Sequence, residues 1–120
     1  MIPRKVVVGG IVHRVVFEDT RKLRGALKQL GVKNWEKKWT YWDLPDRKIY
    51  ISDELPRQLQ KFLLCLEIMK AMSFFVGDKL WENERILRPY AMLLYQFLEG
   101  YEEEMKRGKY ESEEKTRYIS

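Results

Sequence analysis

Alternating apolar positions near the start of the chain predict a β-hairpin. Two β-branched runs, residues 6–8 and 11–17, are separated by Gly9 and Gly10. Two glycines accept the positive φ angles of a tight hairpin turn, so the two runs are expected to pair as antiparallel strands. The second strand is expected to place four side chains on one face: Ile11, His13, Val15 and Phe17.

A second hairpin is predicted further along the chain. Its strands are expected at residues 35–42 and 47–51, joined by a turn at residues 44–46 that contains a proline and an aspartate. The residues expected on its covered face alternate with polar neighbours: Trp39, Tyr41, Ile49 and Ile51.

Apolar residues at helical spacing predict three helices, over residues 21–30, 56–76 and 84–106. Gly31 and Gly77 follow the first two, in the position where a left-handed residue commonly ends a helix. The third helix contains a proline at position 89. This helix is therefore expected either to begin nearer residue 88 or to bend at the proline.

Together these elements predict an α+β fold. The expected architecture is a small antiparallel sheet of two hairpins, packed against a central buried helix and a long C-terminal helix. Residues 1–107 are expected to form a single domain. From position 108 the sequence is charged and aperiodic, so residues 108–120 are expected to form a flexible tail.

The central helix carries one polar stripe. Residues 62–76 are apolar except for Glu67, Lys70 and Ser73, which lie three residues apart. A buried carboxylate is costly unless it is paired, so Glu67 needs a partner, and Lys70 is the nearest one. An alternative is that the two side chains form an ordinary exposed helix pair, which contributes only about 0.3 kcal/mol.

Charge is unevenly distributed along the chain. Residues 1–61 hold 14 Lys and Arg against 7 Asp and Glu, whereas residues 62–120 hold 9 against 11, for a net charge of +5. A basic half indicates a surface for an acidic partner, protein or nucleic acid, although solvated surfaces also carry such charge. The chain has no leader signal and no apolar run of about 20 residues, so we expect a cytoplasmic protein without a membrane partner.

The sole cysteine and the sole histidine are both expected to be structural. Cys65 has no partner for an internal disulfide and lies within the apolar central helix, where a small core residue is expected. His13 is predicted on a strand as a half-buried or exposed residue rather than as a metal ligand.

Four segments occur in a distinctive order along the chain: Val8-Gly9-Gly10-Ile11-Val12, Lys48 to Pro56, Phe62 to Met72, and Leu94-Tyr95-Gln96-Phe97-Leu98. In order and spacing they resemble small phage-encoded, zincin-like proteins related to the ImmA/IrrE metallopeptidases. The resemblance covers residues 5–100 and implies a zincin-like fold. The third segment then corresponds to the helix that carries the HExxH motif of these enzymes.

The resemblance also implies a metal site whose ligands this chain lacks. Glu67 matches the general base of the motif, but the two histidine positions hold Leu66 and Lys70. A catalytic zinc needs three protein ligands, and the third, generally acidic, corresponds to Arg88 or, with a shifted alignment, to Glu84. We therefore expect no metal, no cofactor and no peptidase activity. In this degenerate site Lys70, together with Arg88, is expected to neutralise Glu67.

The expected function is that of a non-catalytic, phage- or prophage-type interaction protein. Such a protein binds and modulates a host or viral macromolecular complex, for example a defence or transcription complex. The predicted binding residues combine aromatic rings with positive charge, as interface anchors do: Trp35, Lys37, Lys38, Trp39, Tyr41, Trp42, Arg47 and Lys48. An alternative is that Trp39 and Trp42 only pack within the hairpin.

Nucleic-acid binding is the second interpretation. The basic half offers a candidate phosphate-contacting surface: Arg21, Lys22, Arg24, Lys28, Lys33, Lys37, Lys38, Arg47 and Lys48. No helix-turn-helix or RNA-recognition signature accompanies these residues. A retained metallopeptidase is a minor third alternative, and the sequence leaves both the target and the oligomeric state open.

Overall fold

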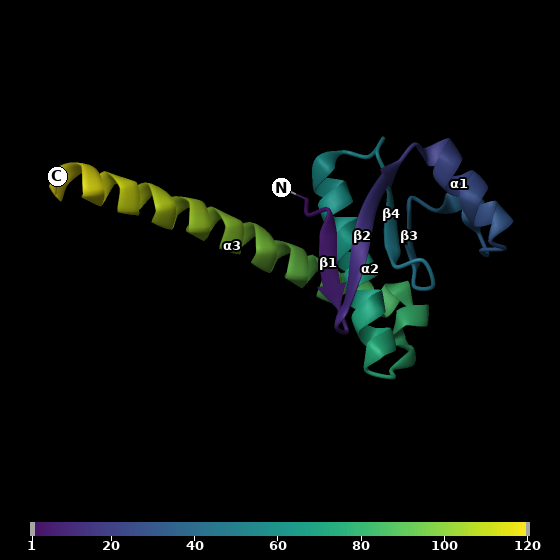
Figure 1. The fold of residues 1–120 in the computed structure, drawn as a ribbon. Helices are drawn as coiled ribbons and strands as arrows, with labels where there is room; N and C mark the ends of the chain where they lie inside the picture. The colour runs from purple at the N-terminus through teal and green to yellow at the C-terminus, as the bar shows by residue number, and fades with distance from the viewer. Residues whose placement is uncertain (1, 120) are drawn as a thin grey trace.

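Four β-strands form one mixed sheet in the computed structural model, which describes the backbone of residues 2–119 and the side chains of residues 2–108 (Figure 1). The strands are β1 (Lys5–Val8), β2 (Ile11–Glu18), β3 (Thr40–Asp43) and β4 (Lys48–Ser52), in the order β1-β2-β4-β3. Both predicted hairpins are confirmed, because β1 pairs with β2 and β3 with β4 in antiparallel fashion. The expectation of a purely antiparallel sheet is wrong, because β2 and β4 are parallel.

The parallel pairing follows from the placement of β4 at the centre of the sheet. Its two isoleucines, Ile49 and Ile51, are fully buried, which favours a strand with neighbours on both sides. The chain leaves β2 through helix α1 (Thr20–Gln29) and enters β3 at the end of the sheet where β2 finished, since Phe17 and Thr40 both pair with Ile51. β3 then runs antiparallel to β2, so the hairpin turn sends β4 in the direction of β2. The strand β3 then occupies the edge, and β4 returns beside β2.

The strand predicted over residues 35–42 is shorter than expected. Asn34 adopts a left-handed conformation, with φ of 59°, and opens a single 3-10 turn, η1 (Trp35–Lys37). This turn is closed by hydrogen bonds from the amides of Lys37 and Lys38 to carbonyls three residues earlier. The extended segment therefore begins only at Thr40.

The register of β3 also differs from the expected one. Thr40 pairs with Ile51 and Trp42 with Ile49, and paired residues share a face of the sheet. Thr40 and Trp42 therefore face the same side as the buried isoleucines. The expectation that Trp39 and Tyr41 lie on this covered face is wrong.

The helices agree with the predicted bounds except at the C-terminal end. Beside α1, they are α2 (Arg57–Phe75) and α3 (Glu84–Ile119), with a 3-10 turn η2 (Lys79–Glu82) between them. The ends of α1 and α2 lie within one residue of the prediction. Asp19 caps α1 by accepting hydrogen bonds from the amides of Arg21 and Lys22 at 2.7 and 3.2 Å.

Helix α3 begins at Glu84 and continues through Pro89. Because proline has no amide hydrogen, the carbonyl of Arg85 lacks its usual donor four residues later. The predicted helix end near residue 106 is wrong, because the helical backbone continues to Ile119. Glutamate, lysine and arginine, all good helix formers, predominate in this segment. The expected flexible tail at 108–120 falls almost entirely on residues whose side chains lie outside the described part.

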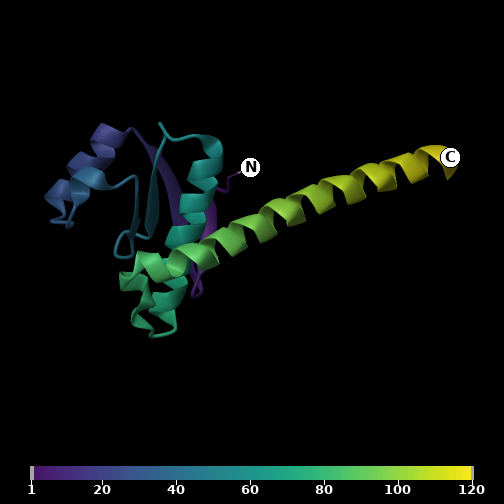
Figure 2. The ribbon, with the colours of Figure 1, turned by 180° about the vertical axis from the view of Figure 1, so that it is seen from behind.

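Helix α2 lies between the sheet and α3 (Figures 1 and 2). On one side Leu64 packs with the sheet residues Val15, Ile49 and Ile51. On the other side Cys65 and Leu66 pack with two residues of α3, Leu87 and Ala91. Contact on both sides explains why the sequence of α2 is apolar around most of its circumference. Figure 2 shows that α3 crosses one end of α2 and then projects away from the body.

His13 is fully buried, so the expectation of a half-buried or exposed histidine is wrong. The indole nitrogen of Trp42 donates to Nε2 of His13 at 3.1 Å, and Nδ1 of His13 donates to the carbonyl of Ile11 at 3.0 Å. One ring nitrogen accepts while the other donates, which requires the neutral ring in a single tautomer. The ring of Trp42 also contacts those of Phe74 and Phe75, which makes it a packing residue.

Candidate functional site

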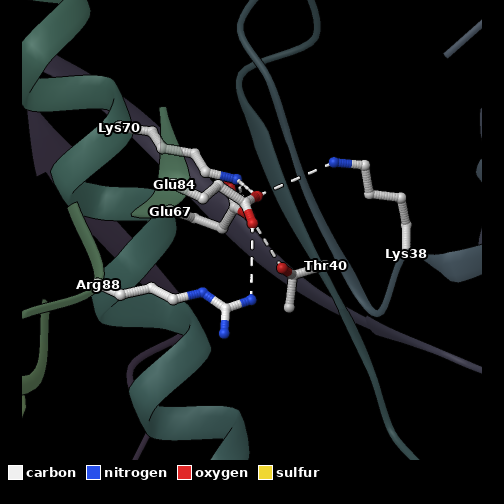
Figure 3. Close-up of polar contacts among 6 residues, drawn as sticks. All are labelled: Lys38, Thr40, Glu67, Lys70, Glu84 and Arg88. Atoms are coloured by element: carbon white, nitrogen blue, oxygen red, sulfur yellow. Dashed lines mark hydrogen bonds and ion pairs between the residues drawn. The ribbon is translucent and has the colours of Figure 1, made fainter. Parts of the chain in front are cut away.

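A cleft of about 530 Å³ opens between β3, the C-terminal half of α2 and the start of α3. Its floor is polar and is made by side chains from three elements: Thr40, Glu67, Lys70 and Glu84 (Figure 3). Its walls are largely aromatic and apolar: Tyr41, Trp42, Leu44, Pro45, Phe74 and Trp81. Glu67 and Lys70 of the polar stripe therefore face a cleft rather than open solvent.

Glu67 is buried, with 2% of its surface exposed. Its Oε1 atom accepts hydrogen bonds from the hydroxyl of Thr40 at 2.8 Å and from the ammonium of Lys70 at 3.2 Å. Of the two alternatives for Glu67 and Lys70, the structure therefore shows the buried pair. Thr40 can reach Glu67 because the register of β3 turns its side chain toward α2.

The ammonium of Lys70 contacts a second carboxylate, that of Glu84 at the start of α3. Lys70 thus lies between two glutamates, and its side chain is only 12% exposed. Lys38 and Arg88 reach Glu84 from its outer sides, at 3.9 and 3.8 Å (Figure 3). The result is a cluster of two acids and three bases that links the β3 edge, α2 and α3.

Charges within this cluster stabilise one another against the cost of burial. Burial opposes the charged form of Lys70, but Glu67 and Glu84 outweigh this effect and raise the pKa of Lys70. Burial likewise acts to raise the pKa of Glu84, but the hydrogen bond from Lys70, together with Lys38 and Arg88, lowers this pKa overall. Lys70 and Glu84 are therefore both charged near neutral pH.

A smaller cavity of about 300 Å³ adjoins the cleft and shares Lys38, Thr40 and Glu84 with it. Leu66 and Arg88 line this second cavity. The positions that the sequence resemblance relates to metal ligands therefore line two adjoining cavities that share Glu84, and none of them holds a histidine. Among the residues with described side chains, no group of three or more His, Cys, Asp or Glu could hold a metal ion.

Three of the eight predicted binding residues lie on one exposed surface. Trp39 is 42% exposed, and the guanidinium of Arg24 lies 4.5 Å from its ring centroid. The ammonium of Lys28 lies 5.3 Å from the ring centroid of Trp35. We call this surface of α1 and η1 the aromatic-basic face, made by Arg24, Lys28, Trp35, Lys37 and Trp39.

The other predicted binding residues lie elsewhere. Lys38, Tyr41 and Trp42 line the cleft, and Trp42 also packs against Phe74 and Phe75. Arg47 and Lys48 lie at the far end of the β3–β4 hairpin, where Lys48 pairs with Asp46 at 3.1 Å. The eight residues do not form one continuous patch, because the short β3 strand separates the two ends of the segment by about 13 Å.

Sequence reasoning missed Thr40 as the partner of Glu67. Thr40 pairs with Ile51 across the hairpin and therefore points inward, but the aromatic neighbours Trp39 and Tyr41 suggested the opposite face. The expectation for Cys65 is confirmed, since it is a buried core residue, and burial raises the pKa of its thiol to about 11. It is therefore uncharged and unreactive near neutral pH.

Within the described part of the chain, none of the helices has the length and apolar character needed to cross a membrane. Comparisons with protein-family models, with curated proteins and with solved structures found no match.

Proposed function

We propose that this chain is a non-catalytic interaction protein, built on a degenerate zincin-like fold, that binds an acidic surface of a host or viral protein complex. The observation that carries the proposal is the position of the Lys70 ammonium between Glu67 and Glu84. A buried ammonium takes the place that the sequence resemblance gives to a metal ion. Because Glu67 and Glu84 both contact Lys70, they are not free to act as metal ligands.

The spatial grouping of the resemblance positions supports this interpretation. Leu66 and Lys70 lie four residues apart on α2, and both contribute to the joined cavities around Glu84. Arg88 lies one turn beyond Glu84 on α3 and contacts it at 3.8 Å. These are the positions at which two histidines and an acidic ligand would be expected in a metallopeptidase of the family that the sequence resembles.

The state of Glu67 argues against hydrolysis. A general base must accept a proton from water at neutral pH. The Oε1 atom of Glu67 already accepts hydrogen bonds from Thr40 and Lys70, so this oxygen is not free to accept a proton from water. Glu67 is therefore a structural hydrogen-bond acceptor in this proposal.

The aromatic-basic face is the surface that we assign to the partner. It combines the exposed ring of Trp39 with a guanidinium that is held in place, because Arg24 also donates from Nε to the carbonyl of Lys38 at 3.0 Å. A fixed guanidinium beside a large ring suits recognition of carboxylates on a protein surface. This face is less suited to stacking on nucleic-acid bases, because Arg24 and Lys28 each cover one face of a tryptophan ring.

Affinity capture from lysate of a bacterial host, with and without nuclease, tests this proposal. The full chain is compared with the variants Lys37→Glu and Trp39→Ala, which change exposed side chains of the aromatic-basic face. The variant Lys79→Glu changes an exposed lysine in η2 and serves as the charge control. We expect a protein partner that survives nuclease treatment, binds the control normally and is lost or strongly reduced with both test variants.

Two outcomes would contradict the proposal. Capture that disappears after nuclease treatment, and falls steeply with salt, would favour the nucleic-acid interpretation. Capture that is unchanged in Lys37→Glu and Trp39→Ala would place the binding site on another surface.

A further inference from the structure

The face of the sheet opposite α2 carries a row of cations. Lys5 of β1 pairs with Arg14 of β2, and Arg14 pairs with Lys48 of β4. Paired residues share a face of the sheet, and the next pair along, Val15 with Ile49, points the other way and packs against α2. Three like charges therefore lie on three adjacent strands, over about 10 Å.

A fourth cation joins this row at the turn between β3 and β4. Arg47 has a left-handed backbone with φ of 53°, which is uncommon for a residue other than glycine. The carbonyl of Arg47 accepts a hydrogen bond from the amide of Arg14 at 2.9 Å, and its amide donates to the carbonyl of Leu44 at 3.0 Å. These two bonds hold the turn against β2, so Arg47 stays beside Arg14.

A hollow of about 400 Å³ lies at this place, and it is lined by Lys5, Val12, Arg14, Asp46 and Arg47. The carboxylate of Asp46 pairs with Lys48 at 3.1 Å. Among the described side chains, Lys5, Arg14 and Arg47 form no ion pair, and all three are exposed. The hollow therefore has an excess of positive charge.

Like charges on neighbouring strands repel, so this row destabilises the free protein. The acid at the β3 end of the row, Asp43, pairs in the sheet with Lys48 and lies on the side away from Lys5 and Arg14. An anion in the hollow would remove the repulsion. The charges of this face therefore match an anionic ligand.

Two tyrosines extend the face beside the cations. Tyr50 follows Lys48 by two residues on β4, which places both on the same side of the sheet, and Tyr50 pairs with Tyr41 on β3. Both rings are partly exposed. Proteins that bind single-stranded nucleic acid combine these two features, because the cations contact phosphates while bases stack on the aromatic rings.

We propose that this face of the sheet binds single-stranded nucleic acid. The phosphates contact Lys5, Arg14 and Arg47, and a base stacks on Tyr50. A row across three strands is longer than one phosphate group, which favours a polymer over a single small anion. An acidic protein segment would match the charge but has no bases to stack on the tyrosines. The site is separate from the aromatic-basic face and does not rest on the proposed function.

Fluorescence anisotropy of a labelled single-stranded oligonucleotide of about 12 nucleotides, titrated with the full chain, tests the site. For three phosphate contacts we expect the logarithm of the binding constant to fall with the logarithm of the salt concentration with a slope of about −2. Arg14→Glu is expected to weaken binding at least about tenfold at low salt and to reduce this slope by about one. Tyr50→Leu is expected to weaken binding about tenfold with the slope unchanged.

The variant Lys37→Glu is the charge control. It reverses an exposed cation of the aromatic-basic face and is expected to bind the oligonucleotide like the wild type. Thermal unfolding followed by circular dichroism measures the stability of each variant. Arg14→Glu removes the repulsion from Lys5 and Lys48, so it is expected to unfold at the wild-type temperature or above it. Its loss of binding then has a local cause rather than loss of the fold.

Several results would overturn the proposal. Wild-type protein that does not bind the oligonucleotide at low salt has no such site. Equal weakening by Lys37→Glu and Arg14→Glu would show that binding depends on total charge and not on this face. Unchanged binding by Tyr50→Leu, or a duplex of the same length bound as tightly, would exclude recognition of single strands. Polyglutamate that displaces the oligonucleotide at an equal concentration of charges would identify an acidic protein segment as the occupant.

Discussion

At the scale of single residues, Lys70 links the two carboxylates of the candidate site. Its ammonium is the hydrogen-bond donor shared by Glu67, which is buried, and Glu84, which is partly exposed. A buried carboxylate that loses its cationic partner is poorly stabilised, because solvent does not reach it. The stability of the cluster is therefore expected to depend more on Lys70 than on either outer cation.

Replacement of Lys70 by alanine is expected to lower the free energy of unfolding by roughly 3–5 kcal/mol, because it leaves Glu67 buried and unpaired. The double variant Glu67→Gln/Lys70→Met removes both charges and is expected to recover much of the loss. Urea denaturation measures all three proteins.

The variant Lys61→Ala provides a matched control. Lys61 pairs with Glu99 at 2.9 Å, but the Glu99 side chain is 41% exposed. Loss of such an exposed pair is expected to cost much less than loss of the buried Lys70 contacts. If Lys70→Ala costs no more than Lys61→Ala, the buried cluster has no special role in stability.

At the scale of elements, the first hairpin is joined to α2 through the turn between β1 and β2. Gly9 and Gly10 both have positive φ, at 59° and 77°. Only Gly9 lies against another element, because a Cβ atom there would come within 2.5 Å of the ring of Phe75, whereas one on Gly10 would meet nothing within 4 Å. The close approach at Gly9 allows Phe75 to sit beside His13 and Trp42.

The two glycines make a matched pair for mutation. Gly10→Ala is expected to cost about 1 kcal/mol from backbone strain alone. Gly9→Ala has the same backbone strain and must also displace the packed ring of Phe75, so it is expected to cost about 2–4 kcal/mol. Thermal or urea unfolding measures the difference, and equal costs at both positions would show that the Gly9–Phe75 contact is not tightly packed.

At the scale of the whole molecule, the charge cluster joins three elements, and its stabilising effect is expected to depend on pH. The pKa of Glu84 is lowered from its ordinary value of 4.5, so the contribution of Glu84 is fully present above pH 4.5 and is lost as the pH falls through the lowered value. The pKa of Lys70 is raised from 10.5, so the contribution of Lys70 is present below pH 10.5 and is lost as the pH rises through the raised value.

Urea midpoints measured across this pH range are therefore expected to fall at both ends for the wild type. The variant Lys70→Met removes the lysine and its effect on Glu84, so its midpoint is expected to change less at both ends. The same pH profile in both proteins would show that other groups control the pH dependence of folding.

Zinc retention tests the interpretation that the site between α2 and α3 is a degenerate metal site. Wild-type protein is expected to retain far less than one zinc per chain after dialysis, because the ligand positions hold Leu66, Lys70 and Arg88. The triple variant Leu66→His/Lys70→His/Arg88→Glu supplies two histidines and a carboxylate at the positions that the resemblance gives to metal ligands, and it is expected to retain about one zinc per chain. Elemental analysis measures both.

A histidine pair elsewhere on α2, Ile68→His/Met72→His, is the control for non-specific binding, since it has the same spacing on another side of the helix. The degenerate-site interpretation would be contradicted by stoichiometric zinc in the wild type. It would also be contradicted by a triple variant that binds no more zinc than the control pair.

The sequence by itself determined the local elements of this protein. The caps, turns and apolar spacing that set both hairpins and the bounds of α1 and α2 act over a few residues, so they are visible in the chain. The sequence also identified Glu67 as the residue that needs a partner, because a lone carboxylate in an apolar helix is costly wherever the helix packs.

Tertiary structure decided how these elements combine. Three features depend on contacts between segments far apart in the chain. They are the parallel pairing of β2 with β4, the inward direction of Thr40, and the ion pair of Lys70 with a second glutamate. The ion pair between Lys70 and Glu84 is an example. Glu84 lies 14 residues beyond Lys70, across η2, and the two side chains meet because α2 and α3 pack through Leu66 and Leu87. Local propensity cannot specify such contacts, because their energy appears only when the separate elements bury a common core.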